Sequence, residues 1–181
     1  MHAIEIIKEY YRPGSKAYEI MLRHGEDVAR KSVEISSRVA SLNPDVDFIL
    51  EAAKLHDIAI FLTNAPDIGC TGRHPYICHG YLGREILEGL RLPRHAMVCE
   101  RHVGVGITAE DVRTGKLPLP ERDMIPVSIE EKIVCYADKF FSKSSLRTGE
   151  EKSVEEVVSG IARYGQEKVA IFQVWLKFFG P

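Results

Sequence analysis

The sequence predicts an all-α protein, a compact bundle of six to eight helices. Apolar residues recur at three- and four-residue spacing along most of the chain, which is typical of helices with one buried face. Residues that favour helix N-termini precede several of these stretches, and alternating strand patterns are scarce. Together these observations favour a helical bundle over an α/β or all-β fold.

The first half of the chain contains five predicted helices. A short helix over 4–11 is broken by Pro13-Gly14, and Ser15 caps a long helix that reaches Leu42. Asn43, as an N-cap before proline, begins a helix over 45–62 that is apolar on nearly every side, so we expect it to be central. A loop follows, and prolines begin two more helices. Their ranges are 75–89 and 93–102.

The second half begins with an irregular stretch over 103–127, rich in glycine and proline, in which a Thr108 cap allows one short helical turn. Capping boxes at Ser128 and Ser153 predict two further helices, the first running to Phe141. The strongly apolar segment 169–179 should dock on the core.

The 181 residues fit one domain over 1–181, with its core at about 16–145 and C-terminal helices over 150–179 docked on it. A net charge of −2 gives no reason to expect long nucleic acids as partners, so we expect a small molecule. No stretch is apolar enough for a membrane span, and a homodimer is left open. With no signal-peptide pattern, we expect a cytoplasmic protein whose four cysteines are reduced.

Six histidine and aspartate side chains occupy apolar, inward-facing helical positions. One such histidine alone is more often a hydrogen-bonded core residue, and one buried aspartate could be ion-paired. A shared metal centre explains the whole group at once. The members of this group are His24, His56, Asp57, His79, His102 and Asp138.

Imidazole and carboxylate groups suit divalent transition metals, with Fe and Mn the leading candidates and Co, Ni and Zn the alternatives. Six ligands exceed what one catalytic ion with open positions requires and suit two ions about 3.5–4 Å apart. We expect His24, His56, Asp57 and Asp138 to hold the first ion. Asp57 would bridge to the second, held with His79 and His102, and these three are the predicted catalytic residues.

In order and context, these residues resemble the HD-domain superfamily of metal-dependent phosphohydrolases. The resemblance covers 20 to about 145 and includes four flanking segments. These are "AAKLHDIAIF", "HPYICHGYLGREIL", "ERHVGVGIT" and "EEKIVCYADKF". It is closest to small uncharacterised HD hydrolases and to symmetrical dinucleoside tetraphosphate hydrolases, which bind two irons. It implies hydrolysis of a phosphate ester or anhydride of a nucleotide or small phosphorylated metabolite by a metal-activated water.

Substrate charge would be met by basic residues near the ligands in the chain, for which we name Arg73, His74, Arg101 and Lys139. Many relatives carry a lysine three residues after the His-Asp aspartate, whereas this chain has Ile60. The contribution of that lysine to binding the charged substrate must come from another residue or be absent.

Two other functions remain open. Di-iron oxygenases such as inositol oxygenase use the same ordered ligands on the same fold, so the ligands alone do not separate oxygen activation from hydrolysis. A non-catalytic module that senses a nucleotide or a metal is the third possibility. The complete ligand set argues against it.

Overall fold

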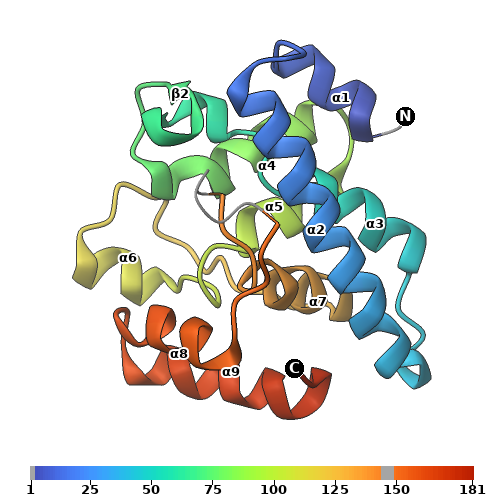
Figure 1. The fold of residues 1–181 in the computed structure, drawn as a ribbon. Coiled ribbons are helices and arrows are strands. Elements are labelled where there is room, and N and C mark those ends of the chain that lie inside the picture. Colours follow the sequence, from blue (N-terminus) through green and yellow to red (C-terminus); the bar gives the residue numbers. More distant parts are fainter. Residues whose placement is uncertain (1–2, 144–148) are drawn as a thin grey trace.

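The computed structural model describes residues 3–143 and 149–181, and it confirms the all-α class (Figure 1). Nine α-helices lie in these residues, where the sequence predicted six to eight, because the stretch after Thr108 forms a helix of its own. The helices are α1 (Ala3–Tyr10), α2 (Lys16–Arg38), α3 (Val46–Leu55), α4 (His79–Gly89), α5 (Pro93–Arg101), α6 (Ala109–Gly115), α7 (Ile129–Asp138), α8 (Val154–Ala162) and α9 (Gln166–Phe179).

Short elements fill the connections between helices. Single 3₁₀ turns occur at Ala40–Leu42, Ile60–Leu62, Pro66–Ile68 and Tyr76–Cys78. The loop between α3 and α4 holds the antiparallel strands β1 (Asn64–Ala65) and β2 (Cys70–Thr71). Gly72 follows β2 where the backbone passes very close to Leu62, so that a Cβ atom at Gly72 would lie 2.0 Å from the Leu62 carbonyl carbon.

Side-chain caps begin four of the described helices where the sequence predicts them. Ser15 and Ser128 accept hydrogen bonds from backbone amides of the first turns of α2 and α7, and Thr108 and Ser153 form complete capping boxes. The expected cap at Asn43 is wrong. Asp45 caps α3 instead, accepting from the Phe48 amide, and Asn43 adopts a left-handed conformation at the end of the preceding turn.

Several helices are shorter than predicted, including α7, which ends at Asp138 rather than at Phe141. The long helix ends at Arg38, and α3 ends at Leu55 rather than near Leu62. Pro75 precedes a 3₁₀ turn, so α4 begins only at His79. After α3 the apolar pattern continues because Ile58, Ala59 and Ile60 are buried as well, and burial alone does not reveal where a helix stops.

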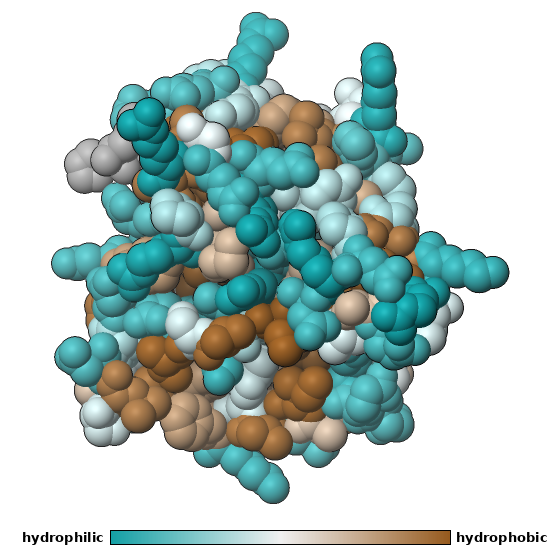
Figure 2. Space-filling view, turned by 180° about the vertical axis from the view of Figure 1, so that it is seen from behind, coloured by the Kyte–Doolittle hydropathy of each residue, from teal (hydrophilic) through white to brown (hydrophobic). Residues whose placement is uncertain are grey.

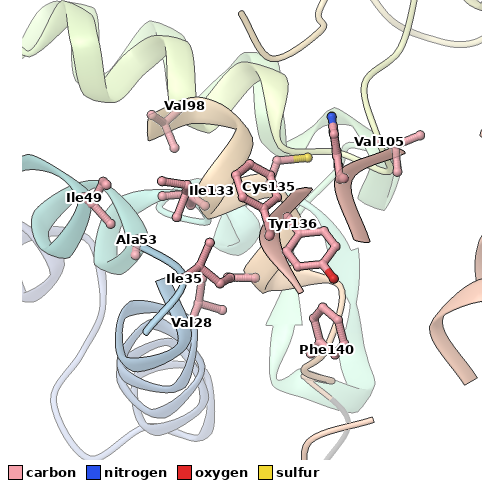
Figure 3. Close-up of a cluster of buried hydrophobic side chains, with 14 of the residues drawn as sticks. Val28, Ile35, Ile49, Ala53, Val98, Val105, Ile133, Cys135, Tyr136 and Phe140 are labelled. Carbon is pink, nitrogen blue, oxygen red and sulfur yellow. The ribbon is translucent and has the colours of Figure 1, made fainter. Parts of the chain in front are cut away.

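The helices pack in pairs around α2, which contacts α3 and α7, while α4 and α5 pack on each other. Figure 1 shows α8 and α9 as a layer below α7, and Phe172 and Phe179 of that layer pack on the ring of Tyr136. The larger hydrophobic cluster joins α2, α3, α5 and α7 and includes Val28, Ile49 and Ile133 (Figure 3).

A second cluster, with Ile20 and Met21 of α2, Leu55 and Ile58, lies toward α1. Along α2, His24 falls between the residues of the two clusters. The pair His56 and Asp57 lies between Leu55 and Ile58 of the second cluster, shortly after Ala53 of the first. Along the chain, these histidine and aspartate residues therefore lie near the change from one hydrophobic cluster to the other.

None of the described helices combines the length and the apolar character needed to cross a bilayer. Apolar side chains do gather on one face, toward the end where α8 and α9 lie (Figure 2). Val174 and Phe178 of α9 are 65% and 53% exposed, and they line a groove together with Leu42 and Ile129. All four cysteines are buried free thiols.

Candidate metal centre

The fold brings all six predicted residues into one buried cluster. Only His24 lies in the interior of a helix. The sequence analysis placed His56 and Asp57 in mid-helix, but they follow the end of α3. His79 begins α4, His102 caps the C-terminus of α5, and Asp138 ends α7. The exposed fraction of these residues ranges from 0% to 8%.

The first group of side chains surrounds Oδ2 of Asp57. The Nε2 atoms of His24 and His56 lie 3.3 Å and 3.1 Å from this oxygen. Asp138 Oδ1 lies 2.9 Å from His24 Nε2 and 3.4 Å from His56 Nε2, and the two nitrogens are 3.3 Å apart. Four potential ligand atoms therefore face one another within a single shell.

The second group surrounds the other oxygen of the same carboxylate. The Nε2 atoms of His79 and His102 each lie 3.3 Å from Asp57 Oδ1 and 3.0 Å from each other. Neither oxygen of this fully buried carboxylate has a hydrogen bond of good geometry among the described residues. An anion left in this state is costly unless cations balance it. Asp57 thus presents one oxygen to each group of histidines.

Backbone carbonyls orient three of the four imidazoles. His56, His79 and His102 each donate from Nδ1 to the carbonyl three residues earlier, at 2.6, 2.6 and 2.7 Å. In the neutral imidazole, a donor at Nδ1 leaves the Nε2 lone pair free and directed at the cluster, as metal-binding histidines require. His24 differs, because its buried Nδ1 has no partner among the described residues.

Burial and neighbouring charges act in opposite directions on the pKa values of the clustered side chains. Burial opposes ionisation of Asp57, but the charges of His56 and Lys143 hold the pKa of its carboxyl well below the usual range. Burial would lower the pKa of His56, yet Asp57 and Asp138 raise it to about 9. For His79 burial prevails and lowers the pKa to about 3, so that this imidazole is neutral.

The separations between these atoms fit a metal centre. Ligands about 2.1 Å from one ion, at the angles of octahedral or tetrahedral coordination, lie about 3.0–3.4 Å apart. The distances within the two groups run from 2.9 to 3.4 Å. This buried His/Asp cluster could therefore bind divalent metal ions, with the two groups divided as the sequence analysis proposed and Asp57 common to both.

Of the four residues proposed for substrate binding, only Lys139 contacts this cluster. Its Nζ donates to Asp138 Oδ2 at 2.8 Å and to the His102 carbonyl at 3.0 Å. The Arg101 guanidinium instead donates to both carboxylate oxygens of Glu131, at 2.9 and 3.1 Å. Arg73 and His74 are exposed residues just after β2, and their substrate role stays a prediction.

The sequence analysis missed three neighbours of the cluster. Lys143 places Nζ 2.7 Å from Asp57 Oδ2, and its position five residues after Asp138 was the available signal. Ile60, which stands where a lysine was expected from the resemblance, is fully buried among apolar side chains. Cys99 and Cys135 donate thiol hydrogen bonds to the carbonyls of His56 and His102, at 2.8 and 3.4 Å. Nothing in the sequence distinguished these cysteines from ordinary core residues.

Comparison with known proteins identifies relatives that are similar to parts of this chain. A tRNA (cytidine(56)-2'-O)-methyltransferase of Picrophilus torridus is 36% identical over 70% of this chain and 33% of its own length. An uncharacterized protein of Methanocaldococcus jannaschii is 38% identical over 52% of this chain and 48% of its own length. A Thermoplasma volcanium protein, named like the first, is 29% identical over 88% of the chain and 41% of its own length.

The chain thus spans a third to a half of the length of these relatives. No solved structure shows significant similarity to it. The family model of the HD domain matches residues 18–142, a range that includes all six clustered side chains and the helices that carry them. With that match over most of its length, this chain belongs to the HD domain family.

Proposed function

We propose that this protein is a metal-dependent phosphohydrolase that cleaves a phosphate ester or anhydride of a nucleotide or small phosphorylated metabolite. The observation that carries the proposal is the position of Asp57, whose two buried oxygens face two separate groups of imidazole and carboxylate ligands. This arrangement is suited to a pair of divalent transition metals. When bound, such a pair supplies a water of lowered pKa and neutralises charge on phosphoryl oxygens.

The residues of the chain prepare the site for that chemistry. The carbonyl bonds of three histidines fix the tautomer that presents Nε2 to the centre, and Lys139 holds Asp138 through the oxygen that does not face the histidines. Two carboxylates do not balance two divalent cations, so the loaded centre is net positive. A positive centre in an apolar surrounding favours an anionic substrate, as phosphate esters are.

The methyltransferase name of two relatives is not extended to this chain. The chain matches only 33% and 41% of the length of those proteins. The six clustered residues, moreover, could together bind metal ions, and this supports metal-dependent chemistry.

Metal content and a substrate screen test the proposal. Protein purified without chelator and reconstituted with Mn, Fe, Co, Ni or Zn should bind about two equivalents. It should release phosphate or alcohol from a panel of phosphomonoesters, phosphodiesters and nucleotides in a metal-dependent way. Asp57→Asn should bind little metal and be inactive, while Lys168→Met, which removes an ammonium paired with Asp111 outside the cluster, should match wild type.

Two results would overturn the proposal. A folded protein that binds no metal under any reconstitution would remove its basis. Iron-dependent oxygen consumption without phosphoester hydrolysis would favour an oxygenase instead.

A further inference from the structure

Lys143 places a buried ammonium group directly against the candidate metal ligands. Its Nζ lies 2.7 Å from Asp57 Oδ2 and 3.8 Å from Asp138 Oδ1, and its side chain is 15% exposed. These two oxygens are the ones that face His24 and His56. The ammonium therefore neutralises the same carboxylate atoms that the first group of ligands would offer to a metal ion.

Lys139 provides an instructive contrast. Its ammonium contacts Asp138 through Oδ2 and also the His102 carbonyl, and neither oxygen belongs to the ligand groups. The contacts of Lys139 are thus compatible with a loaded site. Those of Lys143 are not, because its ammonium and a divalent cation would share one carboxylate oxygen within a region of low dielectric constant.

Loading the site therefore requires the Lys143 ammonium to leave Asp57. The flexible four-carbon stem of lysine allows this movement, and the side chain is not completely enclosed, since 15% of it is exposed. After this movement the ammonium is a cation beside a net positive centre, without its carboxylate partner. An anionic group bound at the same centre is the natural new partner.

We propose that Lys143 is an exchangeable counter-charge, which neutralises Asp57 in the metal-free protein and binds a phosphoryl oxygen of the substrate in the loaded protein. This inference rests on the proposed function and narrows its substrate class. Two divalent cations and the Lys143 ammonium carry more positive charge than the two aspartates balance, and the Lys139 ammonium beside Asp138 adds to this excess. A terminal phosphoryl group with two negative charges balances this excess better than a singly charged phosphodiester.

The first half of the proposal is tested by metal binding alone. Mn²⁺ is titrated calorimetrically into chelator-treated wild type, Lys143→Met, Lys143→Arg and Lys168→Met. Lys143→Met should bind the first ion at least about tenfold more tightly, because no ammonium competes for Asp57. The metal-free form of this variant should unfold at a lower temperature, because a buried carboxylate loses its counter-charge.

Lys168→Met is the matched control. Lys168 is 12% exposed and its Nζ lies 2.5 Å from Asp111 Oδ2, so this variant also removes a largely buried, paired ammonium. It should leave Mn²⁺ affinity at the wild-type value, and Lys143→Arg should stay near it. Unchanged or weaker Mn²⁺ binding by Lys143→Met would refute the competition. Should that variant not fold, Lys143→Gln retains a polar side chain and takes its place.

The second half is tested with inorganic phosphate and dimethyl phosphate as probes on the Mn²⁺-loaded proteins. Wild type should bind inorganic phosphate more tightly than dimethyl phosphate, and Lys143→Met should lose about tenfold or more of its phosphate affinity. Lys143→Arg should retain most of it. Equal phosphate binding by wild type and Lys143→Met would overturn the role of Lys143 alone, whereas no phosphate binding by loaded wild type would count against the proposed function.

Discussion

Binding of a metal ion to the first group should release a proton from His56. In the metal-free protein, burial opposes the charged form of this imidazole, but Asp57 and Asp138 raise its pKa to about 9. At pH 7 the imidazole is therefore protonated and its Nε2 cannot act as a ligand. By contrast His79, with a pKa lowered by burial to about 3, is already neutral and contributes no proton.

The size of the effect follows from that pKa. A proton held with a pKa about two units above the working pH weakens metal binding about a hundredfold, or by about 3 kcal/mol. The apparent affinity should consequently rise about tenfold per pH unit between pH 7 and 9 and level off above. The same proton also affects the stability of the metal-free fold, which falls as pH rises, whereas the metal affinity increases. The raised pKa of His56 stabilises the metal-free fold. This contribution is complete at pH values below about 6.5, the pKa of the imidazole in the unfolded chain, and it is lost as pH rises toward 9.

Calorimetric Mn²⁺ titrations in buffers of different ionisation enthalpy count the protons released at each pH. Wild type should release about one proton more than His56→Gln at pH 7, and this comparison separates the imidazole from any proton lost by bound water. Equal proton release by the two proteins, or an affinity that does not change between pH 7 and 9, would refute the reasoning.

Further predictions concern individual side chains. Asp57→Asn should lower occupancy of both metal positions, whereas His102→Ala should affect mainly the second, so metal analysis showing equal, mild losses would contradict the division of ligands. Arg101→Met should lower the free energy of unfolding by about 1.5–3 kcal/mol, because it leaves a largely buried carboxylate without its guanidinium. A raised KM at unchanged stability would instead support the predicted role of Arg101 in substrate binding. Gly83→Ala should lower both the melting temperature and the metal affinity, since a Cβ there would lie 2.2 Å from Cys99 Sγ; adding Cys99→Ala should recover part of the stability, and no recovery would locate the strain elsewhere.

The sequence by itself determined the helical class and the identity of the cluster. Apolar spacing marked most of the helices, and local capping residues such as Ser15 and Ser153 marked several starts, because both effects act within a few residues of the chain. The cluster was recognisable because six polar residues at buried positions need a common explanation. Burial of polar groups is costly wherever the fold places them.

Only the tertiary structure decided where helices end and which cations reach the cluster. The apolar pattern runs past Leu55 without a break, so it could not show that His56 and Asp57 leave the helix and turn toward the centre. Nor could it separate Arg101, bound to Glu131, from Lys143, which lies against Asp57. Distance along the chain suggested Arg101, but charges interact through space, and the packing of α7 beside α2, α3 and α5 sets those distances.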